Sequence, residues 1–107
     1  MLNPLYMAID IGGTKTAFGF ISEEGEIIYR NEILTGNSSD PLELIGRLTK
    51  IISENFDVFK ENFFIKGAGI GAPNANYFKG TVEHAPNLKW KGIIPLARIF
   101  KENVYVH

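Results

Sequence analysis

Hydrophobic and polar positions in the first third of the chain predict three consecutive strands. Apolar runs rich in β-branched residues cover residues 6–11, 16–21 and 27–34, and such runs bounded by turn residues are typical of strands. The connections between them, residues 12–15 and 22–26, are short and contain glycine. Short connections between consecutive strands predict an antiparallel meander, with the first strand buried.

After residue 40 the spacing of apolar residues changes to three and four, which predicts a helix. Asp40 is the predicted N-cap, Pro41 the first helical residue and Glu43 the acid that reaches back to the cap. Apolar residues at spacings of three and four form one predicted face: Leu42, Leu44, Ile45, Leu48, Ile51, Ile52 and Phe56. The phenylalanines around the helix end are expected in the core: Phe56, Phe59, Phe63 and Phe64.

The rest of the chain contains fewer regular elements. A fourth strand is predicted over residues 64–71, a hairpin over 76–85, a loop over 86–92, a helix over 95–102 and a last strand over 103–107. The order is β-β-β-α-β, then a hairpin and loop, then α-β. This order predicts an α/β fold with a mixed five-stranded sheet and helices on its faces.

The amino-acid composition mainly excludes classes of function and of binding site. The 107 residues carry a net charge of −1 and no cysteine, and the two histidines, His84 and His107, are far apart. A single domain of this charge is not expected to bind nucleic acid, and no disulfide or thiolate metal site is available. Neither a signal peptide nor a membrane-spanning run is evident. A cytoplasmic domain without a membrane partner is therefore expected.

The first glycine turn carries the clearest candidate chemistry. Asp10 ends the first predicted strand, and Gly12, Gly13, Thr14 and Lys15 follow it. A carboxylate at a strand end can hold a hydrated divalent cation, and adjacent glycines let backbone N–H groups approach phosphate oxygens. A structural hairpin turn explains the same residues equally well, so the turn alone leaves both interpretations open.

A second group of glycines, residues 67–71, has the spacing Gly-x-Gly-x-Gly. No helical pattern follows it, so it does not fit a dinucleotide-binding fingerprint, and P-loop spacing is absent as well. Glycines within a strand instead indicate a backbone that lies close to a neighbouring strand or a ligand.

Three segments together resemble the ROK family of sugar kinases and repressors, in the actin-like ATPase superfamily of ribonuclease H-like lobes. They are residues 10–15, residues 69–74, and residues 85–90 with Pro95-Leu96 behind them. Their order and spacing span nearly the whole chain, and the similarity is greatest to the bacterial glucokinases of that family. The resemblance implies a ribonuclease H-like lobe.

The resemblance also implies roles for the first segment. Asp10 would face a magnesium ion, directly or through water, while Gly12, Gly13, Thr14 and Lys15 would approach the phosphates of ATP. These roles agree with the chemistry that the residue types already indicate.

The other two segments would lie near the sugar. Family members usually have Pro-Gly where this chain has Pro73-Asn74, and Asn tolerates the positive φ that the turn requires. Asn74 and Asn87 are the candidate substrate-binding residues, because an amide can donate to and accept from sugar hydroxyls. The alternative for Asn87 is a loop asparagine that caps its own backbone.

The resemblance finally implies that residues 1–107 are the N-terminal lobe of a longer kinase. Family members have an Asn-Asp pair after a strand like 103–107, and that aspartate is the general base. Their second lobe carries a zinc motif. No catalytic residue is thus expected within this chain, which alone should be inactive. The parent protein is expected to form homo-oligomers.

The expected activity of the parent is transfer of the γ-phosphoryl group of ATP to a hexose, most readily glucose at its 6-hydroxyl. The first alternative is a sugar-responsive repressor, which such a family also contains; repressors carry a DNA-binding domain ahead of the phosphate motif, and nine residues precede Asp10 here. The second alternative is a sugar-binding module without catalysis.

Overall fold

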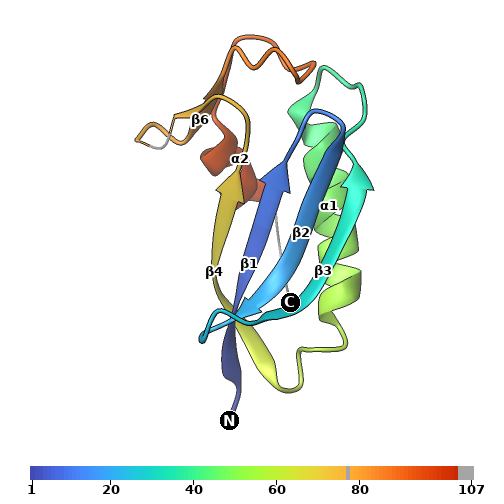
Figure 1. The fold of residues 1–107 in the computed structure, drawn as a ribbon, viewed down its shortest axis with the longest axis vertical. Coiled ribbons are helices and arrows are strands. Elements are labelled where there is room, and N and C mark those ends of the chain that lie inside the picture. Colours follow the sequence, from blue (N-terminus) through green and yellow to red (C-terminus); the bar gives the residue numbers. More distant parts are fainter. Residues whose placement is uncertain (77, 104–107) are drawn as a thin grey trace.

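The main sheet has four strands in the part of the chain that the structure, a computed structural model, describes: residues 1–76 and 78–103. The strands β1 (Asn3–Ile11), β2 (Lys15–Ser22), β3 (Ile27–Leu34) and β4 (Phe63–Gly71) lie in the order β3-β2-β1-β4 (Figure 1). β1, β2 and β3 pair antiparallel, whereas β4 pairs parallel to β1. The predicted meander and mixed sheet are confirmed.

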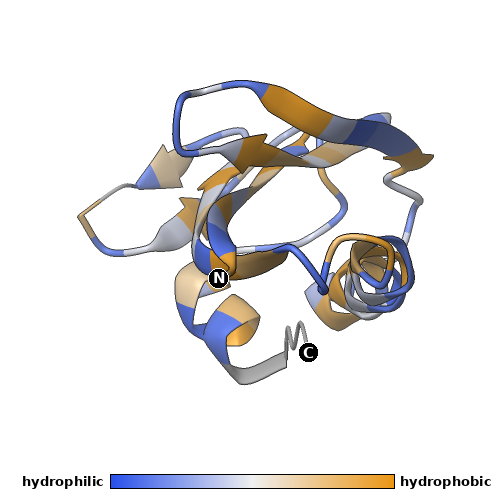
Figure 2. Cartoon of the chain, turned by 90° about the horizontal axis from the view of Figure 1, so that it is seen from below, coloured by the Kyte–Doolittle hydropathy of each residue, from blue (hydrophilic) through white to orange (hydrophobic). Residues whose placement is uncertain are grey.

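Two helices, α1 (Pro41–Phe56) and α2 (Leu96–Asn103), pack on the same face of this sheet (Figure 2). Helices on opposite faces are therefore not seen among the described residues. Asp40 caps α1 as predicted, since its carboxylate accepts a hydrogen bond of 3.0 Å from the Leu42 N–H. The predicted back-reaching role of Glu43 is wrong, because its carboxylate binds Arg47 instead. No described helix combines the length and the apolarity needed to cross a membrane.

A second, smaller sheet lies beyond β4. Its strands are β5 (Ala75–Asn76), β6 (Thr81–Glu83) and β7 (Ile93–Ile94), all antiparallel. The predicted hairpin corresponds to β5 and β6, while β7 was not predicted. The expected fifth strand of the main sheet, residues 103–107, falls almost entirely outside the described residues.

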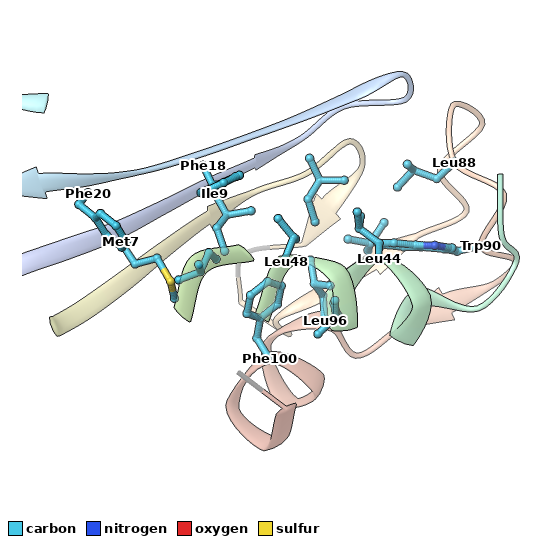
Figure 3. Packing of buried hydrophobic residues seen from close by; sticks show 14 of the residues in the cluster. Met7, Ile9, Phe18, Phe20, Leu44, Leu48, Leu88, Trp90, Leu96 and Phe100 are labelled. Carbon is cyan, nitrogen blue, oxygen red and sulfur yellow. The ribbon is translucent and has the colours of Figure 1, made fainter. Parts of the chain in front are cut away.

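The core lies between the main sheet and the two helices (Figure 3). Alternate residues of β1 supply one layer, namely Leu5, Met7, Ile9 and Ile11, all at most 5% exposed. The prediction for the phenylalanines holds only in part: Phe56 is buried, Phe59 and Phe63 are partly buried, and Phe64 is 42% exposed. Leu42, expected on the buried face of α1, is 48% exposed, whereas five other residues of that predicted face are buried: Leu44, Ile45, Leu48, Ile52 and Phe56.

Candidate active site

Asp10 lies where β1 and β4 end side by side. Because these strands are parallel, their carboxyl ends share one edge of the sheet, and Asp10 pairs in register with Gly71. A Cβ on Gly71 would stand 3.2 Å from Asp10 Oδ1. Ile9 and Ile11 point into the core, so strand alternation turns Asp10 to the open face. Its carboxylate is exposed and has no hydrogen bond or ion pair within residues 1–76 and 78–103.

The glycine turn between β1 and β2 presents free backbone donors. Gly12 closes the turn with its own N–H, which donates to the Lys15 carbonyl at 2.9 Å. A Cβ on Gly12 would stand only 2.7 Å from that carbonyl oxygen, so the turn requires glycine. In the described part of the chain, the N–H groups of Gly13 and Thr14 have no acceptor. Consecutive free N–H groups of this kind form an anion-binding concavity.

The same turn touches the Asn87 loop. A Cβ on Gly13 would stand 2.8 Å from the Asn87 carbonyl oxygen and 3.0 Å from Asn87 Cβ. Figure 1 shows the β1–β2 turn at the same end of the molecule as the loop that precedes β7. The first and third segments that the sequence singled out are therefore in contact.

Three buried side chains anchor this loop: Ala85, Leu88 and Trp90, with Leu88 and Trp90 packed near Leu44 of α1 (Figure 3). Asn87 lies between them and is exposed. The expected alternative, an amide that caps its own backbone, is not observed, because the Asn87 amide makes no hydrogen bond to any described residue. Its donor and acceptor remain available to a ligand.

Asn74 has a different environment. Its φ of 55° confirms that this turn needs a residue tolerant of the left-handed region. The Asn74 amide donates to the carbonyls of Glu83 at 3.2 Å and His84 at 3.3 Å. This amide therefore holds the β5–β6 hairpin together, and its contact with sugar stays a prediction.

Two buried threonines, Thr16 and Thr35, support the turn from its buried side, and neither was predicted as a site residue from the sequence. Thr35, which follows β3, donates its backbone N–H to the Thr14 carbonyl at 2.8 Å and its hydroxyl to the Gly12 carbonyl at 2.7 Å. The Thr16 and Thr35 hydroxyl oxygens lie 2.8 Å apart. For Thr16 alone a usable signal was present, since it alternates with core residues in β2 and a hydroxyl on a buried face needs a partner.

Arg47 of α1 holds the residues that follow β3. It donates to the carbonyls of Leu34 and Thr35, both at 2.6 Å, and binds the Glu43 carboxylate at 2.7 and 3.0 Å. The hydrogen bond from Arg47 holds the pKa of Glu43 below its ordinary value. The guanidinium thus uses its fork on one carboxylate and two main-chain oxygens.

The open face around Asp10 suits a hydrated cation and a polyphosphate. A hollow of about 230 Å³ opens there. Its lining combines Asp10 and the small residues Ala8, Ala17 and Gly19 with larger, mostly apolar residues that include Ile21, Ile27 and Arg30. Lys15 is exposed and extends from the same face. Residues 1–76 and 78–103 contain no cluster of three or more His, Cys, Asp or Glu side chains around one point. An all-protein metal cage is therefore not formed by them, whereas Mg²⁺ commonly binds through one carboxylate, water and substrate phosphates.

Comparison with known proteins agrees with this arrangement. Residues 6–107 match the ROK family. The glucokinase of Streptomyces coelicolor is 34% identical over 88 residues, which cover 81% of this chain and 26% of that protein. The chain spans about a quarter of the length of the curated relatives it matches.

Solved structures extend the likeness to the fold. A ROK family glucokinase from Streptomyces griseus in complex with glucose and AMPPNP has a TM-score of 0.68 and 28% identity, covering 96% of this chain and 32% of that one. A ROK family transcriptional regulator, a homologue of the Escherichia coli MLC protein, has a TM-score of 0.75 at 20% identity, covering 98% and 27%. At that identity the regulator shows the shared fold alone. With the family match covering nearly all of its length, the chain belongs to the ROK family.

Proposed function

We propose that the protein carrying this chain transfers the γ-phosphoryl group of ATP to a hydroxyl of a hexose, with the 6-hydroxyl of glucose as the first candidate. One observation carries the proposal: the glycine turn, with its free N–H groups, touches the loop that exposes Asn87. Phosphoryl transfer depends mostly on positioning and charge stabilisation. A turn whose free N–H groups can bind phosphate, next to an Asn87 amide with no described hydrogen-bond partner, suits this reaction.

Each group has a defined part in the proposed reaction. The N–H groups of Gly13 and Thr14 donate to phosphate oxygens of ATP, Lys15 adds positive charge, and the Asn87 amide orients the sugar. Asp10 would hold Mg²⁺, which when bound supplies charge neutralisation at the phosphates. Asn74 acts on the sugar indirectly in this scheme, through the turn it stabilises.

The covalent step exchanges one P–O bond for another. The sugar oxygen bonds to the γ-phosphorus, the bond to the β,γ-bridging oxygen breaks, and ADP leaves. The sugar proton passes to a general base, proposed as an aspartate beyond His107. The chain is then the N-terminal lobe, and the general base and second lobe belong to the rest of the protein.

A sugar-responsive regulator of the same family is the second candidate, since the fold of this chain is shared by a ROK family transcriptional regulator as well as by kinases. Titration of the protein with glucose and MgATP distinguishes the candidates. Sugar-dependent ADP release supports the kinase, and sugar binding without turnover supports a regulator. Binding of neither ligand would contradict both and leave a structural module.

A further inference from the structure

The backbone N–H, the hydroxyl and the carbonyl of Thr35 all form hydrogen bonds, the first two to the glycine turn and the third to Arg47. Its N–H binds the Thr14 carbonyl at 2.8 Å, its hydroxyl binds the Gly12 carbonyl at 2.7 Å, and its own carbonyl accepts from Arg47 at 2.6 Å. Thr35 itself is 5% exposed, and its hydrogen bonds to Gly12 and Arg47 are partly buried. A single residue outside the turn therefore holds two of the turn's carbonyls.

The hydrogen bonds fix which of the two threonine hydroxyls, Thr16 or Thr35, is the donor in their mutual contact. Each threonine hydroxyl carries one proton. The Thr35 proton goes to the Gly12 carbonyl, so Thr16 must be the donor in the 2.8 Å contact between the two hydroxyls. The chain of donors runs from Thr16 through Thr35 to Gly12, and Thr16 is fully buried.

The hydrogen bond to the Gly12 carbonyl also fixes the orientation of the Gly13 N–H, because both groups belong to one planar peptide unit. The Gly12 carbonyl and the Gly13 N–H belong to one peptide unit, which is trans, so the two groups point in opposite directions. The carbonyl is held inward on the buried hydroxyl. The Gly13 N–H must therefore face away from the core, where it has no acceptor among the described residues.

We infer that Thr35, anchored by Arg47, is a positioning residue that orients the Gly12–Gly13 peptide for binding of a nucleotide phosphate. Arg47 fixes Thr35 from α1, and it also binds the Leu34 carbonyl and the Glu43 carboxylate. The chain turns away directly after Thr35 at Gly36, whose φ is 87°. A helix outside the nucleotide site thereby sets the orientation of a donor inside it.

This inference rests on the proposed function, and substitutions at Thr35 test it. Thr35→Val keeps the shape of the side chain and removes the hydroxyl, whereas Thr35→Ser keeps the hydroxyl. The matched control is Tyr29→Phe, which removes a hydroxyl away from the turn that donates to Asn55 at 2.8 Å and accepts from Asn31 at 3.2 Å. Kinetics in the full protein would separate the KM for MgATP from the KM for sugar, and thermal unfolding would report stability.

Thr35→Val is expected to raise the KM for MgATP about 10- to 100-fold, since displaced supporting groups typically cost that much. The KM for sugar should change much less, Thr35→Ser should restore most of the loss, and Tyr29→Phe should leave the KM for MgATP near wild type. Arg47→Gln should shift the KM for MgATP in the same direction. A wild-type KM for MgATP in Thr35→Val would overturn the inference, as would an equal effect in Tyr29→Phe.

A failure of the proposed kinase function can be distinguished from a failure of the role inferred for Thr35. If the wild-type protein does not bind MgATP, the kinase proposal fails, and backbone NMR then reports on the turn alone. Shifted or broadened Gly12 and Gly13 amide signals in Thr35→Val, restored in Thr35→Ser, would support the role of Thr35 in orienting that peptide. Unchanged signals would overturn it.

Discussion

Gly13 lies against the main chain of Asn87 so closely that a Cβ on Gly13 would stand 2.8 Å from the Asn87 carbonyl oxygen. Real side chains do not tolerate that approach to a backbone atom without displacement. The proposed phosphate turn and the proposed sugar loop therefore depend on each other's position, although more than seventy residues separate them in the sequence.

Gly13→Ala should consequently impair both substrates. The methyl group must push the turn and the loop apart, so the KM values for MgATP and for sugar should both rise and kcat/KM should fall about 100-fold, as expected for a displacement near 1 Å. Gly46→Ala is the matched control, because a Cβ on Gly46 meets nothing within 4 Å. That helical substitution should leave kinetics intact and slightly stabilise the protein. Steady-state kinetics with each substrate varied would show this, and wild-type values in Gly13→Ala would contradict it.

Substitution of the two candidate asparagines, Asn74 and Asn87, should have different effects, on stability in the first case and on sugar binding in the second. Asn74→Ala removes two hydrogen bonds and places a Cβ-bearing apolar residue at a φ of 55°, so it should lower the free energy of unfolding by about 1–3 kcal/mol. Asn87→Ala removes an exposed amide without a described partner, so it should raise the KM for sugar and leave stability within about 0.5 kcal/mol.

Urea denaturation and steady-state kinetics measure these two effects. Asn74→Gly serves as the control for backbone strain, because glycine adopts positive φ freely and should recover part of the lost stability. Destabilisation by Asn87→Ala with an unchanged KM for sugar would reverse the assignment.

Gly19 in β2 leaves no room for a side chain. A Cβ there would overlap the Tyr29 carbonyl oxygen of the neighbouring strand. Gly19→Ala is therefore expected to lower the free energy of unfolding by about 1–3 kcal/mol, the usual cost of overpacking. Gly69→Ala in β4, where a Cβ meets nothing within 4 Å, should not lose stability. Equal midpoints of urea unfolding for the two variants would contradict the packing seen at Gly19.

The Glu43–Arg47 pair should show a specific pH dependence. The hydrogen bond from Arg47 lowers the pKa of Glu43 from its ordinary value of 4.5. A depressed pKa in the folded state stabilises the fold above the unfolded pKa, and this contribution disappears as the pH falls through the folded value. Glu43→Gln should thus unfold at lower urea than wild type at neutral pH, and the difference should vanish in acid. Glu54→Gln on the same helix is the control, and a pH-independent difference for Glu43→Gln would refute the pair's contribution.

Local signals predicted most of the fold. The antiparallel meander followed from apolar runs joined by short turns, and the start of α1 followed from Asp40 and Pro41, because both depend on neighbours in sequence. Glu43 departed from its expected role because Arg47, one helical turn later, is a stronger partner than a backbone N–H. Phe64 is exposed because it alternates along β4 with Phe63 and Ile65, which pack against the core, so its side chain lies on the opposite face of the sheet.

The candidate site was predictable only as separate segments. Residue types pointed to the turn after Asp10, and the family resemblance pointed to Asn74 and Asn87, but neither indicated that Gly13 touches the Asn87 loop. The support from Thr35 could not be read from the sequence, since its partners Gly12 and Arg47 lie 23 and 12 residues away and no local pattern links them.

The most direct test of the central claim is sugar-dependent ADP formation from MgATP by the protein that carries this chain, compared between wild type and Asp10→Asn. Wild type should turn over. Asp10→Asn should be slower by about 100-fold or more, because the carboxylate is assigned to the metal and phosphates, while its unfolding midpoint stays near wild type, since that carboxylate has no described partner. Absence of turnover in wild type, or equal rates in both proteins, would contradict the account.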